Sequence, residues 1–584
     1  MQRLGKMGFM KTKWIFLSAI ALYSANGTLA QTPVVGAGLE VDPYHYQIKR
    51  TGTYDNGTVA CAHPLAAQVG VAVMKTGGNA FDAAIAVQLA LAVVYPGAGN
   101  IGGGGFMTAR VASGNSILML DYREKAPSRA SRDMYLDKDG NALLEKSQNG
   151  HLSVGVPGTV AGLFKTLPYA RLPFRDLIAP AIVLAEKGFV LSETEAKGLN
   201  AARADFVRYN TRRKIAFVKD TGSWHAGDTL VQKDLAETLK RIQKNGAKGF
   251  YEGVTARYMV DEMKRGGGII TLEDLKNYTA VERVPLRFRY RGYDVVSTPP
   301  PSSGGLILAQ VLRMIEPFPV VDMGFHSALS IHLLAEAERR SFADRAQFMG
   351  DPDFWKVPDS VLVSTPYLMQ RMSDFNPDSA TPSRLVEAGN MPISEQTTHI
   401  SIADRYGNMV AVTTTLNNHF GSKTVAGNAG FLLNDEMDDF SVKPGVPNMY
   451  GALGGEANAV APNKRMLSAM SPTLVMKDGH PFLVLGTPGG TTIPTSVIQS
   501  IVHIIDYNMD IEAAIKAPKF HHQWASDILY MEKGFDVKVM DSLRNMGYAI
   551  EVRSPIGRTE IVEYKNGKLL SASDPRGDDS VAGY

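Results

Sequence analysis

Two threonines at the ends of predicted strands are the residues of this 584-residue sequence whose types and spacing could do chemistry. Alternating apolar residues predict strands over 399–403 and 409–415, and the five-residue loop between them fixes a hairpin register. In that register Thr397 lies directly opposite Thr415 on the same face, with Asn417 on the diagonal. A hydroxyl beside a second hydroxyl and a carboxamide could be a nucleophile. Threonine also simply favours strands, and the pattern alone gives that interpretation more weight.

An acidic run is the second candidate site. Asp435-Glu436-Met437-Asp438-Asp439 places four carboxylates in five residues, which suggests a hard metal ion or the ammonium group of a substrate. Calcium loops space their ligands at alternate positions around a glycine turn, and this run has neither feature. A solvated acidic turn and a site for an amine therefore remain equally compatible with the run.

Other chemical signatures are weak. Gly97-x-Gly99-x-x-Gly102, with Asp121 downstream, matches a dinucleotide fingerprint, but a helical pattern precedes it and a strand pattern follows, the reverse of that motif. We expect a structural or substrate-facing loop there. His521-His522 has no partners at zinc-ligand spacing and is expected to be structural. The sequence therefore predicts no cofactor and no metal.

The elements that must position the candidates follow from apolar periodicity. A helix is predicted over 64–75, and a second, buried helix over 80–94 is too short to cross a membrane. Amphipathic helices are expected between about 160 and 290. Strands are expected over 106–111, 116–123, 473–476 and 482–485. The Pro/Ser-rich stretch 377–395 is the best internal linker.

The composition and the N-terminal residues limit the classes of protein to which this chain can belong. The chain is 45% hydrophobic and 20% charged, which is typical of a globular protein, and it has no long basic run that would bind nucleic acid. Residues 1–30 combine basic residues, an apolar stretch from Trp14 to Leu22 and small residues up to Ala30, the pattern of a cleaved signal peptide. We therefore expect a periplasmic or secreted protein without a membrane anchor, in which the single cysteine, Cys61, is buried and inert.

Six ordered motifs, together with flanking sequence from about residue 45 to Tyr584, resemble the gamma-glutamyltranspeptidase family (gamma-glutamyltransferase, glutathione hydrolase). They are Gln396-Thr-Thr-His399, Thr415-Leu-Asn417, Asn434-Asp-Glu-Met-Asp-Asp-Phe440, Pro444-Gly-Val-Pro-Asn-Met-Tyr450, Leu467-Ser-Ala-Met-Ser-Pro472 and Pro488-Gly-Gly490. The resemblance implies an α+β fold, a four-layer αββα sandwich of the N-terminal nucleophile (Ntn) hydrolase type. It also implies a precursor that cuts itself between Gln396 and Thr397 into a large subunit, 31–396, and a small subunit, 397–584, which stay together as a heterodimer.

The resemblance also implies a role for each site residue. Thr397 would be the nucleophile, oriented by Thr415, and Gly489 and Gly490 would form the oxyanion hole. The substrate's α-carboxylate would bind Arg123 and Ser468, its ammonium would bind Asn417, Glu436 and Asp439, and Tyr450 would close over it. The implied substrates are glutathione and other gamma-glutamyl compounds, with water, amino acids or dipeptides as acceptors.

One departure from the family pattern lies at Ala469, where many members have a second serine. A lost neutral hydrogen bond is worth roughly 0.5–1.5 kcal/mol, so we expect weaker substrate binding and retained activity. The nearest rival interpretation is a cephalosporin or glutaryl acylase, which shares the self-processing chemistry but takes acyl groups without the α-amine. An exported binding protein that never matures is the rival from another class.

Overall fold

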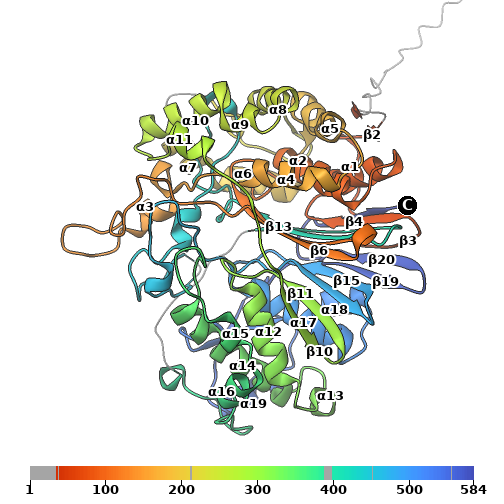
Figure 1. Ribbon diagram of the computed structural model, residues 1–584, viewed down its shortest axis with the longest axis vertical. Coiled ribbons are helices and arrows are strands. Elements are labelled where there is room, and N and C mark those ends of the chain that lie inside the picture. The colour runs from red at the N-terminus through yellow and green to blue at the C-terminus, as the bar shows by residue number, and fades with distance from the viewer. Residues whose placement is uncertain (1–33, 37–38, 211–213, 387–396, 450, 554) are drawn as a thin grey trace, which may run out of the picture. The chain divides into compact units, whose positions relative to one another are not determined.

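Two antiparallel seven-stranded sheets lie face to face in the computed structural model (Figure 1). The structure describes residues 34–36, 39–210, 214–386, 397–449, 451–553 and 555–584, all within one compact unit. The first sheet runs β10 (Leu286–Tyr290), β11 (Tyr293–Ser297), β14 (Thr473–Lys477), β15 (His480–Gly486), β19 (Glu560–Lys565), β20 (Lys568–Ala572) and β3 (Thr51–Tyr54). The second runs β21 (Ser580–Gly583), β4 (Gly57–Cys61), β12 (Thr398–Asp404), β13 (Met409–Thr415), β5 (Gly104–Val111), β6 (Ser116–Asp121) and β9 (Val281–Glu282).

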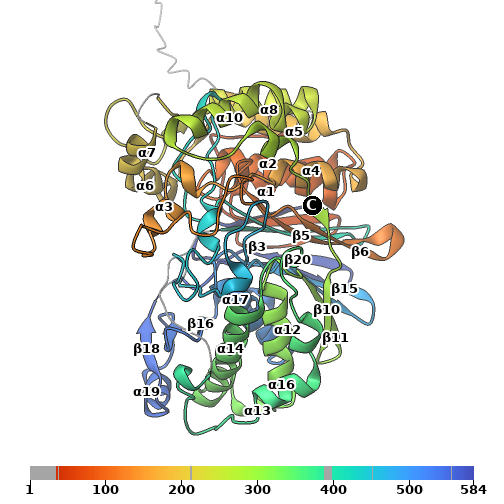
Figure 2. The same ribbon diagram turned by 60° about the vertical axis from the view of Figure 1, so that its left-hand side comes forward.

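Helices cover the outer face of each sheet, as Figures 1 and 2 both show. Over the second sheet lie α1 (Pro64–Lys75), α2 (Ala80–Val94), α4 (Thr159–Thr166), α5 (Phe174–Lys187), α6 (Glu193–Ala201), α8 (Lys233–Asn245) and α10 (Gly253–Gly266). Over the first lie α12 (Gly304–Ile315), α14 (Ala328–Phe348), α17 (Thr492–Ile505) and α18 (Ile511–Lys516). The order helix, sheet, sheet, helix is the predicted four-layer αββα sandwich of an α+β protein.

The residue alternation along β12 and β13 decides which side chains enter which layer. Ile400 and Val412 point into the core beneath α1 and α2, whereas Ala403 and Ala411 belong to a core between the two sheets. Odd-numbered positions of this hairpin therefore face the opposite sheet. Because every odd position shares this face, Thr415 also points between the sheets.

The sequence-based hairpin register is confirmed. The pairs run from Ala403 with Met409 to Thr398 with Thr414, so one further step places Thr397 opposite Thr415. The helices predicted over 64–75 and 80–94 are confirmed by α1 and α2, and the buried Cys61 is also confirmed.

The strand predicted from residue 106 begins two residues earlier. Gly104 and Gly105 pair with Thr415 and Thr414. A Cβ at Gly104 would lie 2.4 Å from the Tyr122 carbonyl oxygen, so only glycine allows this close approach. The glycines that indicated a loop thus belong to a strand that passes unusually close to its neighbour.

The expected signal peptide, 1–30, lies outside the described residues, and the described part of the 377–395 linker contains only a short 3₁₀ turn, Ser383–Leu385. Among the helices that the structure describes, none has both the length and the apolar character needed to cross a membrane.

Candidate active site

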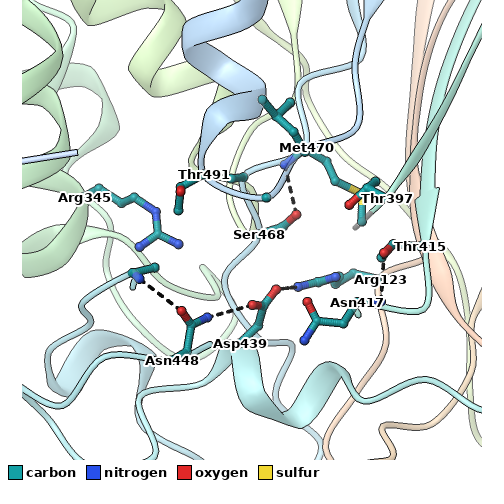
Figure 3. Close-up of a pocket in the computed structure, with 14 residues that line it drawn as sticks. Arg123, Arg345, Thr397, Thr415, Asn417, Asp439, Asn448, Ser468, Met470 and Thr491 are labelled. Carbon is teal, nitrogen blue, oxygen red and sulfur yellow. Dashed lines mark hydrogen bonds and ion pairs between the residues drawn. The ribbon is translucent and has the colours of Figure 1, made fainter. Parts of the chain in front are cut away.

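One cavity brings most of the predicted site residues together (Figure 3). It is lined by Arg123, Arg345, Thr397, Thr415, Asn417, Asp439, Asn448, Ala452, Ser468, Ala469, Met470, Gly490, Thr491 and Ile493. These residues come from segments more than 300 positions apart, so the two-sheet fold is what assembles them. The predicted Glu436 lies directly behind this wall, in contact with Arg123.

One side of the cavity is uncharged. Thr397 precedes β12 and is 5% exposed, and Thr415 ends β13. The Thr415 Oγ1 accepts a hydrogen bond of 2.8 Å from the backbone N–H of Asn417. Asn417 has a left-handed φ of 76°, which asparagine tolerates better than most residues, and its Nδ2 donates to the Asp435 carbonyl (3.1 Å). The hairpin end and this tight turn fix the Thr415 hydroxyl.

The start of α17 closes the same side. Gly489 and Gly490 have φ values of 135° and 51°, conformations that residues with side chains rarely adopt, and Gly490 lines the cavity. The backbone N–H of Thr492 donates to the Gly489 carbonyl (3.0 Å) as the helix begins. The first N–H groups of a helix carry its positive dipole end. This end of the cavity is therefore suited to a developing negative charge.

The other side of the cavity is charged and buried. Arg123 follows β6 and is 1% exposed, and its Nη1 lies 2.5 Å from Glu436 Oε2. Its Nη2 pairs with Asp439. Asp121 accepts from the Arg123 backbone N–H (2.9 Å) and is itself bound by Arg283 (2.6 Å). Asp121 therefore anchors the arginine, and its weak match to a ribose-binding residue has a structural explanation.

Carboxylates outnumber cations here. Asp435, Glu436 and Asp438 are fully buried, so the solvated-turn interpretation of the acidic run is wrong. Burial raises the pKa of Glu436 well above its ordinary value despite the opposing effect of Arg123, and burial likewise raises the pKa of Asp438 to about 7. Glu436 Oε1 has no hydrogen-bond partner among the described residues. An additional cation would relieve this excess of buried negative charge.

Ser468 and Ala469 form a further part of the wall. The rigid turn before α12 holds them, because Ser468 N–H donates to the Pro301 carbonyl (2.8 Å) and Ser303 N–H donates to the Ser468 carbonyl (2.9 Å). Ser468 Oγ accepts from the Met470 N–H (3.1 Å). The side chain at Ala469 is only a methyl group, so the departure from the family motif lies within the cavity itself.

The loop that follows the acidic run covers the charged side. Asn448 Nδ2 donates to Asp439 Oδ1 (2.9 Å), and the Met449 N–H donates to Asp438 Oδ2 (2.7 Å). Tyr450, the predicted lid residue, and Gln396, the residue before the predicted cut, lie outside the described residues.

Arg345, Asn448, Met470 and Thr491 line the cavity but were not predicted as site residues from the sequence. Arg345 projects from α14, and its Nε donates to Ser303 Oγ (3.1 Å) while burial lowers its pKa to about 10. Figure 3 shows Arg345 across the cavity from Thr397. The signal that could have revealed it is a charged residue within the long buried helix, but periodicity does not say which cavity such a residue faces.

His521 and His522 are buried away from this cavity, and His521 Nδ1 lies 3.0 Å from Thr495 Oγ1. Their predicted structural role agrees with this packing. Burial raises the pKa of the Cys61 thiol, which keeps it protonated and unreactive.

Comparison with known proteins shows the family to which this chain belongs. The family model described as gamma-glutamyltranspeptidase matches residues 66–584, which include every described residue of the cavity. The chain belongs to the gamma-glutamyltranspeptidase family. It is 46% identical over 557 residues to the glutathione hydrolase proenzyme of Escherichia coli (strain K12), covering 94% of this chain and 95% of that protein.

Solved structures agree with the family and the fold. The gamma-glutamyltranspeptidase of Helicobacter pylori is 45% identical, with a TM-score of 0.55, over 56% of this chain and 94% of that one. The cephalosporin acylase of Bacillus halodurans is 27% identical, with a TM-score of 0.79, over 94% of this chain and 99% of that one. The sandwich is thus of the Ntn hydrolase type, and the chain is an enzyme of the hydrolase and acyltransferase kind.

Proposed function

We propose that this gamma-glutamyltranspeptidase family member is a self-processing enzyme that cleaves the gamma-glutamyl bond of glutathione and related compounds through a Thr397 acyl-enzyme. The observation that carries the proposal is the pairing of Thr397 with Thr415 on one side of a cavity whose other side holds Arg123 beside Glu436 and Asp439. Such a cavity joins a nucleophile to groups that complement an amino acid's α-carboxylate and α-ammonium.

The precursor would lose residues 1–30 on export to the periplasm and be cut between Gln396 and Thr397. The sheet supports lasting association of the two products, 31–396 and 397–584. Strand β12 pairs with β4, and β13 pairs with β5, so strands from both products alternate in one ladder. Cleavage would leave these hydrogen bonds intact.

The cut would free the α-amino group of Thr397, which can act as the base for the hydroxyl of the same residue. A free α-amino group has a pKa near 8, so at neutral pH it can accept the proton of its own residue's hydroxyl. The Thr397 oxygen would attack the gamma-glutamyl carbonyl, and the amine would pass the proton to the departing nitrogen. Water, or the amine of an amino acid or dipeptide, would then take the glutamyl group from the ester. Thr415 would hold the attacking hydroxyl in place.

The backbone N–H groups of Gly489 and Gly490, at the start of α17, would bind the oxyanion that forms during both steps. Gly490 lines the cavity directly. The missing Cβ atoms and the positive end of the helix thus favour the same chemistry.

Recognition would use an exchange of ion pairs. In the structure Arg123 is neutralised by Glu436 and Asp439. A substrate's α-carboxylate can take the arginine while its ammonium takes the carboxylates and Asn417, so no charge is left buried and alone. Ser468 would add one hydroxyl to the carboxylate, and Tyr450 would cover the bound glutamyl group.

The similarity to the Bacillus halodurans cephalosporin acylase over nearly the whole chain is an observation in favour of the acylase alternative. An acyl group without an amine would leave the buried carboxylates around Glu436 without an added cation. The charge balance of the cavity therefore supports the gamma-glutamyl substrate.

The test combines the intact mass of the purified protein with release of glutamate from glutathione. Wild type should separate into two chains, the smaller beginning at Thr397, and should liberate glutamate, whereas Thr397→Ala should do neither. Wild type that splits but leaves glutathione untouched would favour the acylase. Wild type that remains one inactive chain would favour the binding protein that never matures.

A further inference from the structure

A second cavity, of about 220 Å³, lies beneath the start of α6 and shares no lining residue with the catalytic cavity. Its walls come from the residues after α2, from α6 and the residue Leu191 before it, and from the turn after β13. Arg558, just before β19, and Asp578, just before β21, complete the wall. This volume lies below the roughly 300–1,000 Å³ of sites for drug-sized ligands, so the cavity would take a smaller molecule.

The α6 side of the second cavity is acidic. Asp578 accepts a hydrogen bond from Ser192 Oγ (2.7 Å) at the helix start. Glu195 Oε2 accepts from the Ser192 N–H (2.8 Å), and its Oε1 lies 3.2 Å from His63 Nε2. Two carboxylates thus share this wall, each held by the helix cap.

Another part of the wall carries a guanidinium. Arg558 Nη2 donates to the Tyr95 hydroxyl (2.8 Å) and lies 3.3 Å from the buried Asp579. These neighbours raise the pKa of Arg558 against the effect of burial, so the side chain stays charged. The cation is fixed in place by its neighbours while still facing the cavity.

Leu191, Leu199 and Phe420 give the rest of the wall an apolar part. The His419 ring fits between Gly97 and Gly198. A Cβ at these two positions would lie 2.3 Å and 3.0 Å from the ring. His419 Nδ1 is buried and has no hydrogen-bond partner in the described part of the chain. Burial lowers the pKa of this histidine to about 4, so the ring is neutral at physiological pH.

We propose that this second cavity is a binding site for a zwitterionic α-amino acid with an apolar side chain. The ammonium would lie against Asp578 and Glu195, the carboxylate against Arg558, and the apolar side chain against Leu191, Leu199 and Phe420. The proposal is independent of the catalytic function, because it concerns other residues and is tested by binding alone.

L-Leucine is the probe, and ligand-observed NMR titration of the mature wild-type protein gives its dissociation constant. Thr194, exposed at the rim on α6, offers a way to fill the mouth of the cavity without entering the core. Thr194→Trp should weaken leucine binding more than tenfold. The matched control is Lys197→Trp on the same helix, a residue that is 74% exposed and lies outside the cavity wall, and it should bind leucine as wild type does.

Asp578→Asn keeps a hydrogen-bond acceptor for Ser192 but removes one charge, and it should weaken leucine binding about tenfold, as expected for loss of a charge-assisted contact. Isoamylamine and 4-methylpentanoate each lack one charged group of leucine, so each should bind at least tenfold more weakly than leucine. Absence of leucine binding to wild type, equal binding to Thr194→Trp, or equal affinity for isoamylamine would each overturn the proposal.

Discussion

The two sides of the catalytic cavity differ in the kind of group that builds them. The side around Thr397 is uncharged and is placed by backbone features, namely the end of one hairpin and the start of α17. The opposite side consists of buried charges, Arg123 with Glu436 and Asp439, that come from segments more than 300 residues apart. The function of the first side depends on the positions of its backbone and hydroxyl groups. The function of the second side depends on the balance of its buried positive and negative charges.

This difference predicts how substitutions act. A change on the uncharged side should alter the rate of the chemical step while substrate binding changes little, because we propose that these groups contact the transition state. A change on the charged side should alter substrate affinity and stability first. The substitutions below test that separation.

Gly489→Ala is expected to have the largest effect. Its φ of 135° does not suit a residue with a Cβ, so the backbone should rotate and misplace a donor to the oxyanion. Loss of one such donor costs about 100- to 1,000-fold in kcat. Steady-state kinetics with glutathione should show that loss with KM changed by only a few-fold.

The control is Gly567→Ala, in the turn between β19 and β20. This glycine also has a positive φ, 75°, but its Cβ would meet open space. The variant should lose about 1 kcal/mol of stability and keep its kcat. Equal loss of kcat in both variants would show that the cavity glycines have no special role.

Arg123→Lys should act on affinity. Lysine keeps the charge but cannot bind two partners through a planar fork, so KM for glutathione should rise about 10- to 100-fold with a smaller change in kcat. The matched control, Arg132→Lys, changes a half-exposed arginine paired with Glu456 and should leave both constants unchanged. A fall in kcat alone would contradict the division between the two sides.

Asp438→Asn should change the pH dependence of stability. The folded-state pKa of Asp438 is about 7, above its ordinary value of 3.8, because burial disfavours the charged carboxylate. Its contribution is therefore fully favourable below pH 4 and is lost as the pH rises towards 7.

Urea unfolding should show wild type losing about 3 kcal/mol relative to Asp438→Asn between pH 4 and pH 7. The exposed Asp541→Asn serves as the control and should follow wild type at every pH. If the free energy of unfolding of wild type and of Asp438→Asn changed with pH in parallel, ionisation of the buried acidic run would not destabilise the fold.

Ala469→Ser is the smallest expected change. It restores a hydroxyl beside Ser468 in the cavity wall, and one neutral hydrogen bond is worth about 0.5–1.5 kcal/mol. KM for the glutamyl donor should fall up to about tenfold. Ala452→Ser, at the other alanine of the wall, should change KM less than twofold, and an equal effect of both would argue against a specific contact.

The uncharged side was largely predictable from the sequence because its geometry is local. A five-residue loop and strict alternation were enough to pair Thr398 with Thr414, and thus to set Thr397 opposite Thr415. The charged side was not predictable from pattern. Nothing local shows that α14 brings Arg345 to the cavity, or that Ser147 and Met449 bury Asp438.

The burial of the acidic run shows the same limit. Composition left a solvated turn and an amine site equally open, and only the family motifs favoured the second. Whether the acidic run is exposed to solvent is decided by contacts with residues far away in the sequence. The periodicity of apolar residues carries no information about such contacts.

The most direct test of the central claim is the site of acylation. Mature enzyme would be mixed with glutathione and quenched in acid within milliseconds, and the small chain and its N-terminal peptide would be analysed by mass spectrometry. Our account predicts one gamma-glutamyl group on Thr397. A glutamyl group on any other residue, or an unmodified small chain after the first equivalent of product has been released, would contradict it.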